Sequence, residues 1–411
     1  MGPMSTKTHD VVLFGATSFV GQILARYLLE EFGCDGPLRW AAAGRSRPKL
    51  ESLRTELGAA AKQLPLLVAD AADEDALRKL CRQARVVVST VGPYALYGEP
   101  LIRACVESGT DYCDLTGELQ WIRRMIARYE TQARESGARI VHCCGFDSIP
   151  FDLGVHFLQR EARARFGRPC TTVKMRVKSM RGGFSGGTFA SIMNLVKEAA
   201  SDPNLRRELA DPYSLCPAGY GPKVRQHNVK FAEYDADFAA WTAPFIMGAL
   251  NVRIVQRTNA LQRQAYGKEF RYDEAVMTGR GLRGQAAAAA LSAGLAAFMG
   301  AGAIGPTRML MSKFLPAPGE GPSPEAQRKG SYDLRFLGRT DDGRALRVRV
   351  AGDRDPGYSS TARMLGQSAA CLVQDVAADV PGGFWTPASL FGDLLVRRLQ
   401  ERAGLSFSVL D

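Results

Sequence analysis

The stretch His9-Asp10-Val11-Val12-Leu13-Phe14-Gly15-Ala16-Thr17-Ser18-Phe19-Val20-Gly21 decides the fold of this chain. Its apolar first half predicts a buried strand, and its second half predicts a tight turn that leads into a helix, which is how a doubly wound sheet opens a dinucleotide site. In the pattern G-x-x-G-x-x-G, Gly15 allows the turn and Gly21 allows the helix to pack close to the strand. Ser18 stands at the middle position, so the motif alone also fits an ordinary strand-turn-helix. The turn residues that we expect to contact the cofactor are Gly15, Ala16, Thr17, Ser18, Phe19, Val20 and Gly21.

Length and composition indicate a folded protein of two or three domains, because the chain has 411 residues, 46% of them hydrophobic and 23% charged. The 53 Lys and Arg residues exceed the 42 Asp and Glu residues and give a net charge of +11. This charge favours phosphates, anionic lipid or an acidic partner protein. The sequence has no basic block interleaved with aromatic residues and no zinc-finger or helix-turn-helix signature, which argues against nucleic acid as a partner.

Cysteine and histidine usage indicates a reduced protein without a metal site. The nine cysteines are an odd number and contain no C-x-x-C pair, as is typical of free thiols in the cytosol. The four histidines are scattered without the spacing of zinc ligands. Because the N-terminus has no apolar signal region, we expect a cytoplasmic protein.

Residues 1–150 alternate between short apolar runs and stretches with helical spacing of apolar residues. The runs predict strands, and they lie at residues 9–14, 39–44, 64–69, 86–90, 111–115 and 139–144. Six strands that alternate with helices predict an α/β fold with a doubly wound parallel sheet, the Rossmann architecture, over residues 1–150.

The pattern changes after Pro150. We expect a linking helix at residues 151–166 and irregular structure at residues 202–250. Further strand-like runs lie at residues 171–180, 251–255, 269–277, 331–337 and 345–350. They predict a mixed or antiparallel sheet in an α+β second domain over residues 151–350, followed by a C-terminal segment over residues 351–411.

Residues 284–307 contain no charged residue and are long enough to span a bilayer. Alanine and glycine dominate this stretch, and large apolar side chains are sparse, so insertion into lipid would gain little free energy. Three interpretations stay open: a buried or partner-facing helix, a segment in peripheral contact with lipid or a membrane surface, and a true span.

The end of the second predicted strand indicates which dinucleotide binds. A site selective for NAD places Asp or Glu there, whereas this sequence has Gly44-Arg45-Ser46. A guanidinium next to a hydroxyl suits a 2'-phosphate, so we predict that Gly44, Arg45 and Ser46 select NADP (NADPH). Asp70 ends the third strand, where it could contact the adenine side or cap the helix that follows.

Three chain segments, at residues 89–98, 114–118 and 143–147, follow the carboxyl ends of the later predicted strands. Open α/β sheets bind ligands at these ends, so we expect the segments to converge on one crevice. We expect Thr90, Val91, Gly92, Pro93 and Tyr94 to contact the cofactor, with Gly92-Pro93 under the nicotinamide ribose. The phenols of Tyr94 and Tyr97 could donate a proton, and the acids Asp114, Glu118 and Asp147 could orient a substrate. Packing of the tyrosines and helix capping by the acids are the alternatives. We name Tyr94, Tyr97 and Asp147 as the catalytic candidates.

Cys143 and Cys144 are weaker candidates for a nucleophile. A nucleophilic thiol needs a basic partner, and the basic residue next to them is His142. In a strand, the side chain of His142 would point to the face opposite that of Cys143.

Several motifs in order resemble the saccharopine dehydrogenase-like superfamily, and within it the branch of the trans-acting enoyl reductases and the saccharopine dehydrogenase-like oxidoreductase. The motifs are Phe14-Gly15-Ala16-Thr17-Ser18-Phe19-Val20-Gly21, Ala43-Gly44-Arg45-Ser46, Thr90-Val91-Gly92-Pro93-Tyr94 with Tyr97-Gly98, Asp111-Tyr112-Cys113-Asp114-Leu115-Thr116-Gly117-Glu118, Cys144-Gly145-Phe146-Asp147-Ser148-Ile149-Pro150, Ser185-Gly186-Gly187-Thr188, Asp211-Pro212-Tyr213, Ala243-Pro244-Phe245, Arg257-Thr258-Asn259-Ala260-Leu261 and Trp385-Thr386-Pro387-Ala388. The resemblance covers nearly the whole chain. Ser18 departs from the pattern, which usually has glycine there.

The resemblance implies a Rossmann domain, an inserted α+β domain and a C-terminal segment that returns to the first domain. It also implies an NADPH-dependent enoyl reductase that acts in trans on an acyl chain held by the acyl carrier domain of a separate synthase. The chemistry implied is hydride transfer from the nicotinamide to the β-carbon and protonation of the α-carbon. A basic, partly apolar surface fits an acidic carrier and a greasy chain.

Two other functions stay open. One is saccharopine-type reductive C–N chemistry on an amino acid, which needs arginines for substrate carboxylates and has Arg181 as its best candidate. The other is a non-catalytic NADP-binding protein that contacts lipid or a membrane through residues 284–307. A homodimer is among the expected oligomeric states.

Overall fold

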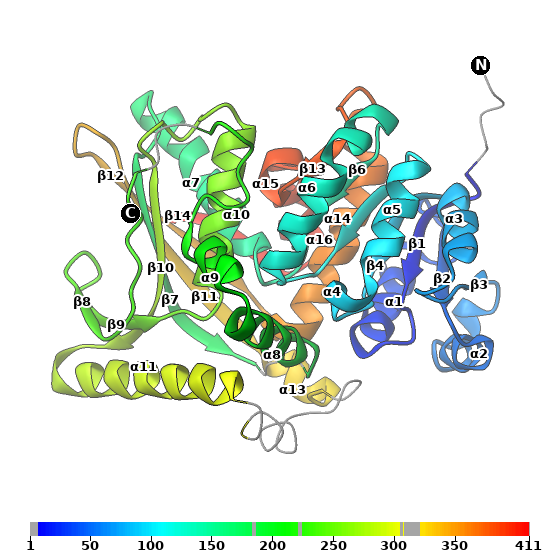
Figure 1. Cartoon of the computed structure of the whole chain (residues 1–411), viewed down its shortest axis with the longest axis horizontal. Coiled ribbons are helices and arrows are strands. Elements are labelled where there is room, and N and C mark those ends of the chain that lie inside the picture. The colour runs from blue at the N-terminus through cyan, green and yellow to red at the C-terminus, as the bar shows by residue number, and fades with distance from the viewer. Residues whose placement is uncertain (1–6, 183–185, 221–223, 305–306, 308–320, 411) are drawn as a thin grey trace.

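The computed structural model describes residues 7–182, 186–220, 224–304, 307 and 321–410, and it contains two seven-stranded sheets (Figure 1). The first sheet is parallel and has the strand order β13-β6-β5-β4-β1-β2-β3. Its strands are β1 (His9–Phe14), β2 (Trp40–Gly44), β3 (Leu66–Val68), β4 (Ala84–Ser89), β5 (Asp111–Asp114), β6 (Arg139–Val141) and β13 (Gly383–Trp385). Because β2 and β4 flank β1, the strand order reverses at β1, which is where such sheets bind dinucleotides. This confirms the predicted Rossmann-type sheet and adds a seventh strand to the six expected.

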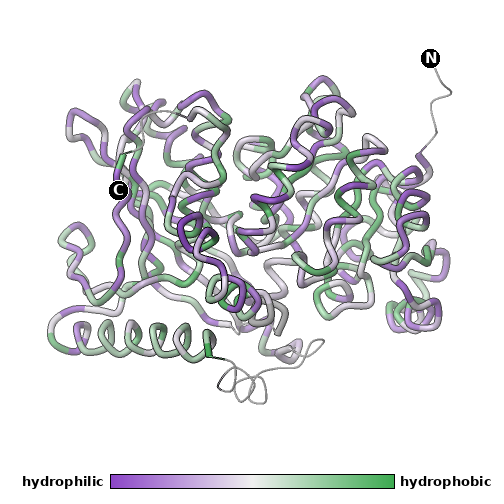
Figure 2. The backbone as a smooth tube through the Cα atoms, in the orientation of Figure 1, coloured by the Kyte–Doolittle hydropathy of each residue, from purple (hydrophilic) through white to green (hydrophobic). Residues whose placement is uncertain are grey.

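Helices pack on the first sheet in two groups. One group contains α1 (Phe19–Phe32), α14 (Thr361–Gln374) and α16 (Asp393–Arg402). The other group contains α3 (Glu74–Gln83), α5 (Glu99–Glu107) and α6 (Leu119–Ser136). The short elements α2 (Arg47–Glu56), η1 (Ala59–Ala61) and α4 (Tyr94–Tyr97) complete this part of the chain. Between the two groups, Val11, Val12 and Leu13 of β1 are fully buried, and Figure 2 shows hydrophobic colouring along these central strands.

The second sheet is mixed and has the order β14-β12-β11-β7-β10-β9-β8. Its strands are β7 (Thr172–Arg181), β8 (Glu233–Asp235), β9 (Ala240–Pro244), β10 (Arg271–Gly279), β11 (Ser331–Arg339), β12 (Ala345–Gly352) and β14 (Leu405–Leu410). β7 and β10 are parallel, and the other neighbours are antiparallel. The helices of this half of the chain are α7 (Ile149–Phe166), α8 (Gly186–Ser201), α9 (Pro203–Ala210), α10 (Gly248–Leu261), α11 (Gly281–Ala303), α13 (Pro324–Lys329) and α15 (Pro387–Leu390).

The C-terminal segment contributes to both sheets. The π-helical turn η2 (Pro356–Ser360), α14 and β13 lie on the first sheet, whereas β14 pairs with β12 of the second. β14 belongs to the second sheet, so residues 351–411 do not return to the first domain alone. The division into 1–150, 151–350 and 351–411 stays a prediction.

Two predictions about residues 202–261 are wrong. Residues 251–255 are not a strand but the first half of α10, in which Asn251 donates a hydrogen bond to the Glu274 carboxyl (3.0 Å). This helix is buried on nearly all sides, so its polar face is masked and its β-branched residues imitate a strand. Residues 202–250 are not wholly irregular either, since they contain α9, β8 and β9.

The uncharged stretch forms most of α11, which lies along the edge of the second sheet (Figure 1). Of the described helices, α11 alone is long and apolar enough to cross a membrane by length and composition, and 17% of its apolar window is buried. Its buried residues are Gly284, Ala288, Ser292 and Gly302. Residues 305–306 of the predicted stretch lie outside the described residues. A fully buried helix is thereby ruled out for the part that is described.

Candidate active site

The turn between β1 and α1 has the close packing that a dinucleotide site requires. Gly15 has a φ of +89°, and the N–H groups of Gly15 and Ala16 both donate to the carbonyl of Ala43 (3.0 Å each). A Cβ atom on Gly21 would lie 2.1 Å from the carbonyl oxygen of Gly15. The helix therefore approaches the turn as closely as only glycine permits.

Ser18 caps α1 instead of opening the turn. Its hydroxyl accepts a hydrogen bond from the N–H of Gly21 (3.0 Å) and lies 2.9 Å from the hydroxyl of Thr90. Because the Thr90 hydroxyl donates to the carbonyl of Gly15 (2.9 Å), the Ser18 proton points to Thr90. The serine hydroxyl is thus occupied within the protein. The N–H groups of Phe19 and Val20 remain as donors at the start of a 14-residue helix, where phosphates bind.

Arg45 and Ser46 follow β2, next to this turn. A Cβ atom on Gly44 would make an ordinary contact with the Thr17 hydroxyl, 3.7 Å away. Arg45 is exposed and has no carboxylate partner in the part of the chain that the structure describes. Ser46 accepts from the N–H of Lys49 (3.5 Å) and caps α2. Among the described residues the Arg45 guanidinium therefore has no acid to neutralise it, and its contact with a 2'-phosphate stays a prediction.

The residue that caps the helix after β3 is Asp73 rather than Asp70, and Asp70 instead forms a local turn. Its side chain accepts a hydrogen bond from the N–H of Ala72 (2.9 Å), which closes a turn after β3. The carboxyl is exposed, and the N–H of Ala69 donates to the carbonyl of Gly44 (3.1 Å), so this strand end still borders the Arg45 position.

The loop after β4 lies against the glycine turn. A Cβ atom on Gly15 would lie 2.7 Å from both the Thr90 hydroxyl and a methyl group of Val91. The following Gly92–Pro93 peptide is cis. Gly15, Thr90 and Val91 thus lie together at the switch point between β1 and β4, and their contact with a dinucleotide stays a prediction.

Tyr94 does not fit the proton-donor role predicted for it. Its hydroxyl donates to the carbonyl of Ser89 (2.9 Å) and accepts from the N–H of Leu115 (3.5 Å), and its ring packs on Trp121. The side chain is buried, and burial raises the pKa of Tyr94 well above its ordinary value. We therefore correct its role: the phenol supports the loop. Tyr97, by contrast, is 50% exposed.

Glu118 fixes the same loop. Its carboxylate accepts from the N–H groups of Tyr94 (2.7 Å) and Ala95 (3.0 Å), and from the hydroxyl of Ser191 in α8 (2.9 Å). Since the side chain is buried and carries these three hydrogen bonds, it holds α4 and α8 together rather than orienting a substrate.

Asp147 lies in the loop between β6 and α7, beside the turn that precedes Glu118. A Cβ atom on Gly117 would lie 3.3 Å from its Oδ2. Burial raises the pKa of Asp147 to about 6, so the carboxyl holds a proton at a higher pH than an exposed aspartate does. The neighbouring N–H of Phe146 donates to the Thr361 hydroxyl (3.0 Å), which anchors the loop to the start of α14.

The remaining polar groups of this region are structural. Asp114 accepts hydrogen bonds from the N–H groups of Thr116 (3.1 Å) and Cys143 (3.2 Å) and bonds Nδ1 of His142 (2.7 Å). Burial, followed by the nearby charge of Asp114, raises the pKa of the Cys143 thiol, and burial also raises that of Cys144. Neither thiol is an activated nucleophile.

Comparison with known proteins identifies the family. Residues 11–141 match the family model of the saccharopine dehydrogenase NADP binding domain. The trans-acting enoyl reductases of Mycobacterium ulcerans and Mycobacterium bovis (strain BCG) are each 39% identical to this chain, over 409 and 406 residues that cover 96% of both proteins. A Mycobacterium tuberculosis protein that carries the same name provisionally is 41% identical over 412 residues, which is 97% of both chains. The chain belongs to the trans-acting enoyl reductase family.

Solved structures place this trans-acting enoyl reductase family member in a known fold. Saccharopine dehydrogenase (L-Glu forming) from Saccharomyces cerevisiae aligns with a TM-score of 0.53 at 10% identity and covers 98% of this chain and 100% of its own. Homospermidine synthase from Legionella pneumophila aligns with a TM-score of 0.52 at 9% identity, covering 98% and 92%. Both likenesses concern the fold alone.

The geometry fits NADP, the cofactor of the matched domain. Gly15 and Gly21 let α1 begin close to the end of β1, and the N-terminus of a helix is a favourable place for a phosphate. The exposed Arg45 follows β2 beside this turn. In this family member Ser18 replaces the middle glycine of the pattern. The replacement is compensated, because the serine caps the helix whose N-terminus would face the phosphates.

Two residues that organise the site were not predicted. Thr361 anchors the Asp147 loop across 215 residues of sequence, and Ser191 reaches Glu118 across 73. A lone Ser or Thr has no pattern that points to such distant partners, so the sequence offered no signal for either.

Proposed function

We propose that the protein is an NADPH-dependent oxidoreductase, a trans-acting enoyl reductase that acts on an acyl chain carried by a separate synthase. The observation that carries this proposal is the 39–41% identity to trans-acting enoyl reductases over nearly the whole chain, combined with an intact cofactor turn. Saccharopine-type C–N chemistry has less support, because Arg181 is exposed at the end of β7 and the likeness to saccharopine dehydrogenase (L-Glu forming), at 10% identity, concerns the fold alone.

In this proposal the residues of the crevice have separate roles. NADPH supplies the hydride that reaches the β-carbon of the enoyl thioester. The first turn of α1 would bind the pyrophosphate, Arg45 would bind the 2'-phosphate, and the loop 90–93 would support the nicotinamide ribose. Asp147 holds the proton on its carboxyl and delivers it to the α-carbon, so that hydride and proton together saturate the double bond.

The test of the function is the oxidation of NADPH, followed at 340 nm with two substrate sets. We expect turnover with an enoyl thioester and none with an amino acid plus an oxo acid. Turnover with only the second set would replace the enoyl reductase by C–N chemistry. Turnover with neither set, together with tight NADPH binding, would favour a non-catalytic protein.

Substitution of Arg45 by Ala should weaken NADPH binding by about 10- to 100-fold and leave NADH binding unchanged. A charged hydrogen bond is worth about 1.5–3 kcal/mol, and each 1.4 kcal/mol is about tenfold in affinity. Fluorescence titration with both dinucleotides measures the change. The matched control is Arg47→Ala, since Arg47 is nearby but paired with Glu51 (2.8 Å). An Arg45→Ala protein that still prefers NADPH would refute this role.

We further infer that α11 makes peripheral contact with lipid. It exposes Leu282 (84%), Leu291 (45%) and Met299 (38%), and Figure 2 shows the helix in pale to green shades over most of its length. Arg280 and Arg283 stand at its beginning, as suits an anionic lipid surface. A cytoplasmic location at the membrane surface and a homodimer stay predictions.

Flotation with anionic liposomes tests this contact. We expect wild type to float and the variant Leu282→Glu/Leu291→Glu/Met299→Glu to remain in the soluble fraction, because carboxylates at these three exposed positions of α11 are repelled by an anionic lipid surface and oppose insertion. The control is Phe231→Glu, which alters an equally exposed apolar side chain (57%) outside α11. Equal flotation of all three proteins, or none by wild type, would refute the contact.

A further inference from the structure

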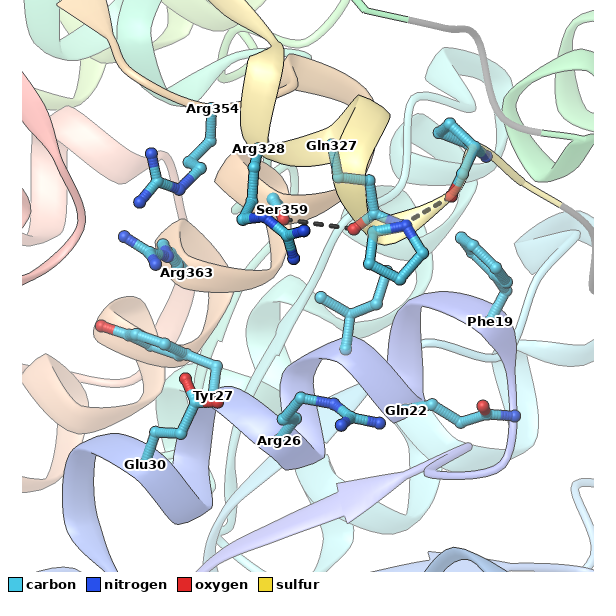
Figure 3. A pocket seen from close by; sticks show the side chains of 13 residues that line it. Phe19, Gln22, Arg26, Tyr27, Glu30, Gln327, Arg328, Arg354, Ser359 and Arg363 are labelled. Carbon is cyan, nitrogen blue, oxygen red and sulfur yellow. Dashed lines mark hydrogen bonds between the residues drawn. The ribbon is translucent and has the colours of Figure 1, made fainter. Parts of the chain in front are cut away.

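A groove runs between the outer face of α1 and the elements α13, η2 and the start of α14 (Figure 3). It has a volume of about 440 Å³ and lies outside the crevice described above. Phe19, Ile23 and Tyr27 of α1 form its apolar floor, at the spacing of one helix face.

Four arginines line this arginine groove, and one acid, Glu30, opposes them. They are Arg26 on one wall and Arg328, Arg354 and Arg363 on the other. Arg354 pairs with Asp353 (3.2 Å), and Arg363 lies over the ring of Tyr27. Arg26, Arg328 and Arg363 have no carboxylate within ion-pair distance among residues 7–182, 186–220, 224–304, 307 and 321–410. The groove therefore presents three arginines without an ion-pair partner against one acid, Glu30.

The second wall of the groove is held in place by Gln327. Its side-chain amide donates to the carbonyl of Pro322 (2.8 Å) and accepts from the hydroxyl of Ser359 (3.2 Å), as the dashed lines in Figure 3 show. Its own carbonyl accepts from the N–H of Asp355 (3.0 Å). These bonds join α13 to η2 and to Pro322, so the backbone of the second wall is fixed before any ligand binds, which reduces the entropic cost of binding.

The inner end of the groove borders the cofactor turn. Phe19 is the first residue of α1, and its ring packs edge-on against Tyr358 at 4.9 Å. The preceding residue, Ser18, contacts Thr90 in the loop after β4. The inner end of the groove, at Phe19, is therefore one residue from Ser18, which lies at the edge of the crevice described above.

We propose that the arginine groove is the docking site for the acidic acyl carrier domain of the separate synthase. This inference rests on the proposed function. The arginines are exposed or half-buried and stand on both walls, an arrangement that suits several carboxylates spread over a protein surface better than one small anion. The apolar floor accommodates the side chains between those carboxylates. A carrier docked here would lie beside Phe19, the first residue of the helix that follows the cofactor turn.

The test compares two double charge reversals. The groove variant is Arg26→Glu/Arg328→Glu, which changes one exposed arginine on each wall. The control is Arg225→Glu/Arg271→Glu, which makes the same change of charge at two exposed arginines lining a separate cavity. The substrates are one enoyl chain on an isolated acyl carrier protein and the same chain on N-acetylcysteamine, which has no carrier and no charge.

We expect the groove variant to lose about 10- to 100-fold in kcat/KM with the carrier-bound chain, since like charges across an interface cost several kcal/mol. Its kcat/KM with the N-acetylcysteamine thioester should equal that of wild type, which also shows that the fold is intact. The control should match wild type with both substrates. An unchanged groove variant, or a loss in the control instead, would overturn the inference.

Binding separates this inference from the proposed function. Fluorescence anisotropy with labelled acyl carrier protein should show a Kd that rises with salt and rises about 10- to 100-fold in the groove variant. If wild type reduces neither thioester, the proposed enzyme function fails while this measurement still tests docking. Equal Kd values for wild type and the groove variant would overturn docking whatever the activity.

Discussion

Replacement of Asp147 by Asn lowers kcat with an enoyl thioester by about 10²- to 10⁴-fold, the usual contribution of a general acid. The expectation follows from the carboxyl beside Gly117, whose pKa burial raises to about 6. Only the protonated form can donate. The kcat of wild type should therefore fall as the pH rises through about 6, whereas the residual kcat of the Asn variant should not change there.

Two tyrosine variants serve as controls for Asp147. Tyr94→Phe should keep nearly full kcat and lose about 1 kcal/mol of stability, because it removes the hydrogen bonds to Ser89 and Leu115. Tyr97→Phe should be close to wild type in both respects. If Tyr97→Phe instead shows the large loss and Asp147→Asn does not, the exposed phenol is the proton donor.

Stability gives an independent readout on Asp147. A carboxyl with a raised pKa binds its proton more tightly in the folded state, so its contribution to folding stability is present at low pH and is lost as the pH rises through about 6. The Asn variant should therefore have an equal or higher Tm than wild type at pH 8. A variant that is both inactive and much less stable would point to misfolding rather than to a lost proton.

Replacement of Gly21 by Ala should raise the Kd for NADPH by more than about 100-fold. The added Cβ would lie 2.1 Å from the carbonyl oxygen of Gly15 and 2.8 Å from the hydroxyl of Ser18, so α1 must move away from the turn. This displacement removes the N–H groups of the first helical turn from the pyrophosphate. Fluorescence titration measures the affinity, and circular dichroism shows whether the variant is folded.

Gly44→Ala is the matched control for Gly21→Ala. Gly44 lies in the same site and is also buried, but a Cβ there would meet Leu50 at 3.6 Å and Thr17 at 3.7 Å, which are ordinary contacts. We expect affinity close to that of wild type. Similar losses in both variants would mean that the site tolerates no added methyl, and the specific role of the Gly15–Gly21 approach would be refuted.

Much of the first domain followed from local patterns. The alternation of strands and helices, the glycine turn and the Arg45 position depend on residues that are close in sequence, and the structure has them where they were expected. The strand predicted at residues 251–255 failed because α10 buries Asn251 and Arg253 together with its apolar residues, so polar and apolar residues alternate there as they do in a strand.

The sequence by itself determined the doubly wound sheet, the cofactor turn and the cation beside it, because turn geometry and hydrophobic periodicity act over a few residues. Only the tertiary structure decided that Tyr94 is a support, that Glu118 is saturated by hydrogen bonds and that Asp147 keeps a raised pKa. Those properties depend on partners from distant segments and on burial. The same holds for the arginine groove, whose two walls are about 300 residues apart in sequence and are brought together by the packing of α14 and η2 on α1.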